Sequence, residues 1–212
     1  SGKIGRVRTI HCRVMVPAGA PPTHPPPPWR LKRDQNGGGI LMNWGVYDLD
    51  FLFSILDWQI EPAAVFAQTF TMPPGLEAHQ APGSDAETHA ILTARFADGS
   101  ILTYERAERA TVAGEHSWQI IGDRGGIRIN MLDPRSTVFW DRVDPAVGLL
   151  SESCFAKPDS TANQHTVPIA DFVEAIRENR QPRTSLERSL VLQSLIDAAY
   201  ESARSGTSIQ FS

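Results

Sequence analysis

The order of apolar and polar side chains predicts more strands than helices in this chain. Residues 6–16 alternate between polar and apolar positions, which is typical of a strand with one buried face. Later segments show similar patterns between short turns, and these are residues 63–72, 87–97, 100–111, 117–122, 126–130 and 135–141. Asp98-Gly99 between two of them is a strong hairpin signal, and Gly125-Gly126 marks another turn. Consecutive strands joined in this way predict a largely antiparallel sheet.

One long helix is predicted in the first third of the chain, over residues 40–56. It follows the three glycines Gly37–Gly39 and ends before Glu61-Pro62. The apolar residues that share one face at helical spacing are Leu41, Trp44, Phe51, Leu52 and Ile55. We expect this face to lie against the sheet.

Two more helices are predicted near the C-terminus. The first spans residues 168–179 and begins at Pro168, a residue favoured in the first helical turn. Its apolar stripe consists of Ile169, Phe172, Val173 and Ile176. The second spans residues 185–204, and Thr184 with Glu187 three residues later reads as its capping box.

A short strand over residues 207–211 closes the chain, after Gly206, which is a typical residue at the end of a helix. The order is therefore strand, helix, many strands, two helices and a strand. This order predicts an α+β fold in a single domain, residues 1–212. The helices would pack on one side of an open-faced, mostly antiparallel sheet, and the other side would be wet or covered by a partner.

Composition excludes several classes of protein. The chain has 41% hydrophobic and 21% charged residues, as globular rather than disordered proteins do. A net charge of −4 with scattered Lys and Arg gives no basic face for nucleic acid. No apolar stretch reaches the ~20 residues that span a membrane. The six histidines do not cluster at ligand spacing, so no metal site is predicted.

Three further features have ordinary explanations. Residues 17–28 are rich in proline and cannot form a helix or a central strand, and we interpret them as a surface loop rather than an SH3-type ligand. Cys12 and Cys154 lie far apart, which favours two inert thiols in a cytoplasmic protein over a disulfide in a secreted one. The opening SGKIGRVR has neither an initiator Met nor the apolar core of a signal peptide, and this indicates a cut fragment.

Motifs for nucleotide binding are missing. A dinucleotide-binding fold alternates strands and helices and carries G-x-G-x-x-G after its first strand. No such fingerprint is present, nor is a P-loop, H-E-x-x-H or G-x-S-x-G motif. A nucleotide-binding half is therefore not expected within this chain.

The stretch GGGILMNWGVYDLD, residues 37–50, carries the candidate chemistry. Three consecutive glycines let the backbone approach a ligand or another backbone closely, and the helix start after them favours an oxyanion. On a regular helix Asn43, Tyr47 and Asp50 fall within ~60° of one another and form a polar stripe. The spacing alone leaves two interpretations open, a pocket lining and a solvated helix face.

This stretch resembles the signature of the Gfo/Idh/MocA family of oxidoreductases, GGG-x-L-x-D-x-G-x-H-x-x-D, on the first long helix of the family's C-terminal domain. IGRVR at residues 4–8 looks like the strand that opens that domain, and Trp29-Arg30 is similar to a common family pair. Residues 171–206 resemble the closing helices. The resemblance runs from about residue 4 to the end and implies a C-terminal domain like that of glyceraldehyde-3-phosphate dehydrogenase.

The resemblance also implies an NAD(P)-dependent oxidoreductase that acts on a sugar, a polyol or a related alcohol. NAD or NADP would be bound mainly by an N-terminal Rossmann domain absent from this chain, so the fragment alone would be inactive. Tyr47 stands at the catalytic acid/base position, where the signature has His. Because a phenol has a reference pKa near ~10, it needs a nearby cation to act as a base, and a lysine of the missing domain could supply it.

Asn43 stands where the signature has Asp, and it is assigned with Tyr47 to the catalytic pair. An amide can orient a hydroxyl but cannot take a proton, so a non-catalytic relative that senses a ligand or supports an oligomer remains the alternative. Asp50 matches the last Asp of the signature. It is assigned to substrate binding together with Trp29 and Arg30.

Gly38 and Gly39 are assigned to cofactor contacts. The implied assembly is a homodimer or homotetramer that pairs through the sheet face. The strands at residues 87–97 and 100–111 contain enough apolar residues to make one face adhesive whichever way the pleat falls, and they are Ile91, Leu92, Phe96, Ile101, Leu102 and Tyr104.

Overall fold

A computed structural model describes residues 2–24, 26–133, 137–156 and 166–211. The strands are β1 (Val7–Pro17), β2 (Pro62–Phe70), β3 (His89–Phe96), β4 (Ile101–Ala110), β5 (Glu115–Gly122), β6 (Gly126–Ile129), β7 (Val138–Asp144), β8 (Gly148–Phe155) and β9 (Ile209–Gln210). The helices are α1 (Arg33–Asn36), α2 (Val46–Ile55), α3 (Thr166–Glu178) and α4 (Leu186–Ser205). A π-helical segment, Leu41–Gly45, leads directly into α2, and a short 3-10 turn spans Glu77–His79.

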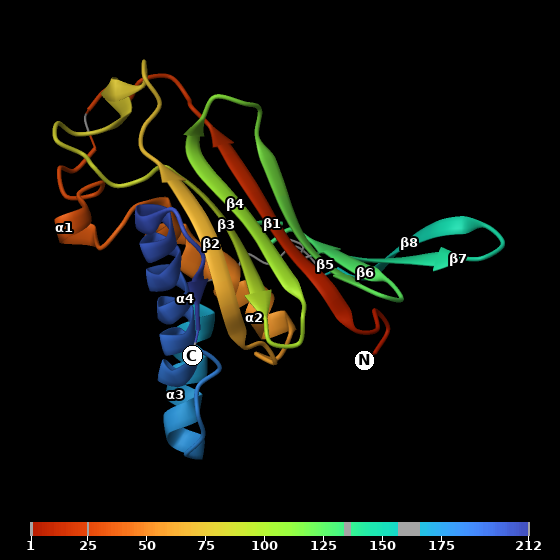
Figure 1. Cartoon of the computed structure of the whole chain (residues 1–212). Helices are drawn as coiled ribbons and strands as arrows, with labels where there is room; N and C mark the ends of the chain where they lie inside the picture. Colours follow the sequence, from red (N-terminus) through yellow and green to blue (C-terminus); the bar gives the residue numbers. More distant parts are fainter. Residues whose placement is uncertain (1, 25, 134–136, 157–165, 212) are drawn as a thin grey trace.

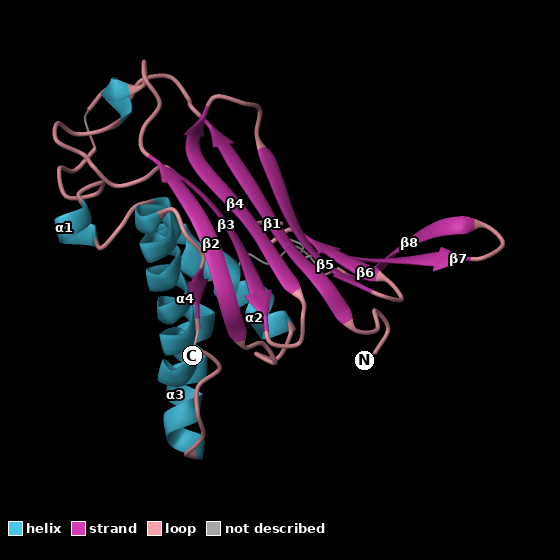
Figure 2. Ribbon diagram, in the orientation of Figure 1, coloured by secondary structure: helices cyan, strands magenta, loops and turns pink. Residues whose placement is uncertain are grey.

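A single nine-stranded sheet organises the described part of the molecule, in the order β8-β7-β6-β5-β1-β4-β3-β2-β9. Every neighbouring pair is antiparallel except β1 and β4, which run parallel with Cys12 opposite Tyr104. The helices lie on one side of this sheet (Figures 1 and 2). The prediction of an α+β fold with an open-faced, mostly antiparallel sheet is therefore confirmed.

The core lies between the sheet and the helices, as the alternation in the strands predicts. Ile10, Cys12 and Val14 of β1 point into it, and Ile91 and Ile101 lie on the opposite, open face. Of the six apolar residues named for these two strands, four are buried in the core, namely Leu92, Phe96, Leu102 and Tyr104. Both cysteines are free, and burial raises the pKa of the Cys12 thiol well above its usual value. That thiol therefore stays protonated.

The Asp98-Gly99 hairpin joins β3 to β4 as predicted. Gly99 has a positive φ of 87°, which a glycine adopts at little cost. The Asp98 carboxylate accepts hydrogen bonds from the N–H and the hydroxyl of Ser100. This turn fixes the register of the two strands that lie beneath the helix of residues 41–55.

The helix predicted over residues 40–56 is present, and its buried face agrees in part with the predicted one, since Leu41 and Leu52 are fully buried. The helix begins with the π-helical segment, whose wider turn shifts the later side chains around the axis. Trp44 and Phe51 are partly buried and pack against the core as predicted, whereas Ile55 is exposed, contrary to the prediction. The residues that face the core are Leu41, Gly45, Asp48, Leu49, Leu52 and Phe53.

Other boundaries also differ from the sequence prediction. The strand expected at residues 135–141 is β7, which starts at Val138, and residues 135–136 lie outside the described part. Its partner β8 was not predicted, and the two form a hairpin that extends away from the rest of the sheet (Figure 1). The predicted capping box at Thr184 and Glu187 is wrong by one residue. Ser185 is the N-cap of α4, and its hydroxyl accepts from the N–H of Arg188.

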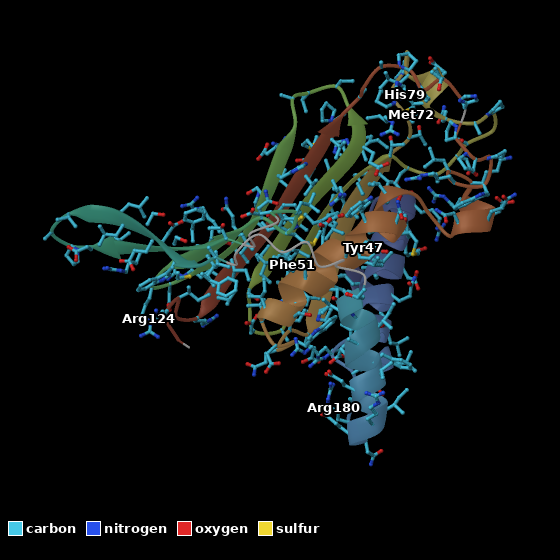
Figure 3. The ribbon with its side chains drawn as sticks, turned by 180° about the vertical axis from the view of Figure 1, so that it is seen from behind. Tyr47, Phe51, Met72, His79, Arg124 and Arg180 are labelled. Atoms are coloured by element: carbon cyan, nitrogen blue, oxygen red, sulfur yellow. The ribbon has the colours of Figure 1, made fainter. Side chains whose placement is uncertain are left out.

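Helix α3 keeps its apolar stripe exposed. The stripe residues Ile169, Phe172 and Ile176 are all more than half exposed. Ala175 is the one buried residue of this helix, which extends beyond the edge of the sheet (Figures 1 and 3). Amphipathic spacing therefore predicted the helix correctly but did not predict its contacts.

Candidate active site

The carboxylate of Glu87 holds the start of the signature helix. It accepts hydrogen bonds from the N–H of Gly39 at 2.9 and 3.0 Å and from the N–H of Leu41 at 3.1 Å. The hydroxyl of Tyr200 donates to the same carboxylate at 2.7 Å, and Glu87 is only 1% exposed. A helix start attracts anions, and here the chain supplies its own. The expectation that these N–H groups are open to a ligand oxyanion is therefore wrong.

Close approach within the domain explains the glycines of the signature. A Cβ on Gly39 would lie 1.8 Å from the carbonyl oxygen of Glu87, and one on Gly38 would lie 2.1 Å from the hydroxyl oxygen of Tyr200. The N–H of Gly39 is already engaged by Glu87. The assignment of Gly38 and Gly39 to cofactor contacts remains a prediction.

Gly39→Ala is expected to destabilise the domain by about 1–3 kcal/mol, because the added methyl meets backbone rather than a side chain that can move. The measurement is the urea midpoint of unfolding. Gly19→Ala is the matched control, since nothing lies within 4 Å of a Cβ at that position. Equal midpoints for the two variants would contradict the close-contact explanation.

A small cavity of about 110 Å³ brings together several of the predicted site residues. Trp29, Arg30 and Asn43 line it, and Gly39 lies at its wall. The other lining residues are Leu31, Asn36, Ile40, Glu87, Thr88 and Glu108. Residues far apart in the sequence thus meet at the start of the signature helix.

Asn36 ties the two loops of this cavity together. Its side-chain N–H groups donate to the carbonyl of Arg30 and to the carbonyl of Gly38, each at 3.1 Å. The carbonyl of Leu31 accepts from the N–H groups of Asp85 and Ala86. These bonds fix the Trp29-Arg30 segment against the helix that carries Asn43.

Tyr47 lies one helical turn beyond Asn43 and outside the cavity lining. Its side chain is 59% exposed, and its ring contacts the edge of Trp44 at 5.6 Å between centroids. Figure 3 looks onto the helix layer, where Tyr47 and Phe51 lie along α2. The phenol is therefore open to a molecule that approaches from the helix side.

Asp50 is not brought to the cavity. It is half-buried, and its Oδ1 is enclosed without a hydrogen-bond partner in the described structure. Burial raises the pKa of this carboxyl, and the positive charge of Arg188 in α4 partly offsets the rise. The assignment of Asp50 to substrate binding remains a prediction, and of the three residues of the expected polar stripe only Asn43 lines the cavity.

A buried ion pair that was not predicted lies beneath the helix. Asp48 is completely buried, and its carboxylate accepts from Arg106 at 2.7 Å, from Trp118 at 3.1 Å and from Tyr104 at 3.2 Å. Burial raises the pKa of Asp48 despite these three donors. The alternation of Leu102, Tyr104 and Arg106 along β4 is the signal that places the arginine in the core.

The guanidinium of Arg106 connects this pair to Tyr47. It lies over the ring of Trp44, 4.3 Å from the centroid, and Trp44 in turn contacts Tyr47. The buried cation of Arg106 thus holds the ring of Trp44 in place, and the ring of Tyr47 packs against Trp44.

Among the described residues no group of three or more His, Cys, Asp or Glu side chains could hold a metal ion. In the same part of the chain no helix is both long and apolar enough to cross a membrane.

Comparison with known proteins shows a family match over more than half of the chain. The model of the GFO/IDH/MocA C-terminal domain matches residues 1–128. The solved structures that share the fold include the following three, each about one-fifth identical to this chain in sequence. The chain spans about three fifths of each of them.

The first is an oxidoreductase domain protein from Kribbella flavida, with 22% identity, a TM-score of 0.80, and coverage of 100% of this chain and 60% of that chain. A levoglucosan dehydrogenase in complex with NADH has 21% identity, a TM-score of 0.80, and coverage of 99% and 59%. The aldose-aldose oxidoreductase from Caulobacter crescentus, complexed with glycerol, has 21% identity, a TM-score of 0.71, and coverage of 99% and 57%.

Proposed function

Since the chain belongs to the GFO/IDH/MocA family and carries its C-terminal domain, we propose that it is the substrate-binding part of an NAD- or NADP-dependent oxidoreductase. The substrate is a sugar, a polyol or a related alcohol. The observation that carries this proposal is the cavity of Trp29, Arg30 and Asn43, one helical turn from the exposed phenol of Tyr47.

The solved relatives support the substrate class. One levoglucosan dehydrogenase structure holds NADH and levoglucosan, and another holds NADH and L-sorbose. The aldose-aldose oxidoreductase holds glycerol. All of these ligands other than the cofactor carry several hydroxyl groups, which suits a cavity lined by an arginine, two asparagines and a threonine.

In the proposed reaction Tyr47 takes the proton of the substrate hydroxyl while the carbon loses a hydride. The nicotinamide, when bound, supplies the hydride acceptor. Arg30 and the amide of Asn43 donate hydrogen bonds that orient the substrate oxygens, and Trp29 offers an apolar surface to its carbon skeleton. Asp50 is kept as a further substrate contact.

The cofactor is proposed to rest mainly on a separate Rossmann domain. Within the described residues only β1 and β4 pair in parallel, whereas a dinucleotide crevice needs several parallel strands. The helix start, where a phosphate would otherwise be favoured, is filled by the carboxylate of Glu87. We therefore take residues 1–212 as one substrate-binding domain, and Gly38 and Gly39 as minor cofactor contacts.

The test of this function uses the full-length protein with NAD and NADP and a panel of aldoses, polyols and anhydrosugars. Formation of reduced nicotinamide is measured by absorbance. We expect turnover with at least one polyhydroxylated substrate. No turnover with any member of the panel, in either direction, would refute the proposal.

The 212-residue chain alone is expected to bind neither NAD nor NADP measurably. The pyrophosphate-binding turn belongs to the proposed separate domain. Calorimetric titration of the chain checks this, with the full-length protein as the positive control. Micromolar binding of NAD or NADP to the chain would show that it contains the nucleotide site itself.

A non-catalytic role is the second candidate, and the specific observation behind it is Asn43. This residue lines the cavity where the signature has a carboxylate, and an amide cannot exchange a proton. Such a relative would bind polyols without turnover, so calorimetry with the panel separates it from an enzyme.

We also propose a cytoplasmic homodimer or homotetramer that pairs through the open face of the sheet. Several apolar residues are exposed there, namely Phe66, Phe70, Ile91, Ile101 and Ile121. Exposed patches of this kind often mark interfaces. Sedimentation of the full-length protein is expected to give a dimer or larger at micromolar concentration, and Ile91→Glu should lower the mass. A monomer at high micromolar concentration would contradict the pairing.

A further inference from the structure

One carboxylate in the cavity has no partner within the described structure. Along β4, Tyr104 and Arg106 point to the helix side and bind Asp48, and Glu108 continues the same row into the cavity. The backbone N–H of Glu108 donates to the carbonyl of Thr88 at 2.8 Å, which fixes its place. Its carboxylate makes no hydrogen bond or ion pair with any residue of the described ranges.

Thr88 lines the same cavity and has a second unsatisfied group. It is only 3% exposed, and its hydroxyl oxygen is buried without a hydrogen-bond partner in the described part of the chain. Buried polar groups are nearly always hydrogen-bonded, and those that are not need a reason. An unpaired hydroxyl beside an unpaired carboxylate is a donor and acceptor set suited to a ligand.

Glu87 shows what a structural carboxylate looks like at this position. It lines the same cavity, but its two oxygens accept from Gly39, Leu41 and Tyr200. Glu108 holds no element of the fold in this way. A folding role therefore explains Glu87 and does not explain Glu108.

We propose that Glu108 and Thr88 form a subsite for two neighbouring hydroxyl groups of the substrate. The carboxylate of Glu108 accepts from both hydroxyls, a short and strong type of hydrogen bond. The hydroxyl of Thr88 bonds to one of the same oxygens. Glu108 thereby supplies the carboxylate that Asn43, in the same cavity, does not. This inference rests on the proposed function and deepens it.

The subsite also selects the charge of the substrate. The cavity lining carries two carboxylates, Glu87 and Glu108, against one guanidinium, Arg30. A substrate with its own carboxylate or phosphate would be repelled by Glu108 at this end. The favoured substrates are neutral aldoses, polyols and anhydrosugars with vicinal hydroxyl groups, rather than sugar acids or sugar phosphates.

The experiment measures steady-state kinetics of the full-length protein with its best neutral substrate and with deoxy analogues that lack one hydroxyl. Glu108→Gln and Thr88→Val keep the side-chain shapes, and Glu61→Gln on the surface is the control. We expect KM for the intact substrate to rise roughly 10–100-fold in Glu108→Gln, with a smaller change in kcat. For each deoxy analogue that lacks one of the two hydroxyls, the ratio of KM between Glu108→Gln and the wild type should be smaller than for the intact substrate, a result that a structural role would not give.

Calorimetry of polyol binding separates this inference from the proposed function. If Glu108→Gln turns over substrate with unchanged KM and unchanged preference between intact and deoxy substrates, the subsite is refuted but the proposed enzymatic function is not. If polyols bind in a way that depends on Glu108 but no turnover occurs, the enzymatic function is refuted but the subsite is not. A wild type that binds sugar acids more tightly than neutral sugars would overturn the proposed charge selection.

Discussion

Turnover by the full-length protein is expected to fall by ~10²–10⁴-fold in Tyr47→Phe, while its stability stays unchanged. The phenol is the proposed proton acceptor, and its removal abolishes that step without changing the ring. Tyr47 is mostly exposed, and its hydroxyl makes no hydrogen bond within the described residues. The ring contact with Trp44 survives the substitution, so the fold loses nothing.

The measurements are kcat with the best substrate and the urea midpoint of unfolding. Tyr200→Phe is a matched control, because the hydroxyl of Tyr200 donates to Glu87 and holds the helix start. Tyr200→Phe should lower the stability of the protein but leave proton transfer intact, so the pH profile of its kcat should keep its shape. Unchanged turnover in Tyr47→Phe would remove Tyr47 from the mechanism.

The second large effect is expected in Asp48→Ala, which should lose about 3–5 kcal/mol of unfolding free energy. Arg106 is only 2% exposed, and without Asp48 its charge would be buried and unpaired. Tyr104 and Trp118 would each lose a hydrogen-bond acceptor as well. The helix carries Tyr47 one residue before Asp48, so activity should fall together with stability.

Urea unfolding followed by tryptophan fluorescence measures this loss. Asp141→Ala is the control, since its ion pair with Arg128 is partly exposed and such pairs contribute about 0–1 kcal/mol. The same small loss for both variants would show that the buried pair is not what anchors the helix to the sheet.

Strand alternation and helical spacing were enough to predict the general architecture. The strand of residues 6–16 and the Asp98-Gly99 turn are both found in the structure. A strand with one buried face requires alternating apolar residues, and a tight turn favours Asp-Gly, so both can be recognised in a sequence. Strand β8 has no such pattern, since most of its side chains are exposed and no buried face requires alternating apolar residues. The exposed stripe of α3 shows the converse, a clear pattern whose side chains remain exposed in the described structure.

The site was predicted in part. The signature located Asn43 and Tyr47, and the cavity joins Asn43 with the predicted Trp29 and Arg30. Glu87, Thr88 and Glu108 were missed because they come from strands and turns that contact the helix only in three dimensions. Asp48 was missed because a charged residue on a helix is normally assigned to solvent, and its counter-charge lies 58 positions away.

The pair of Asp48 and Arg106 has a consequence for how this domain changes in evolution. Burial raises the pKa of Asp48 despite its three hydrogen-bond donors, so burying this charged pair costs free energy. Breaking the pair by removing one partner costs free energy as well. Losing either partner alone is therefore the unfavourable step, while exchange of both for apolar residues of similar size is tolerated or stabilising. Across homologues these two positions should vary together, with lineages divided into charged and apolar pairs and few mixed cases between them.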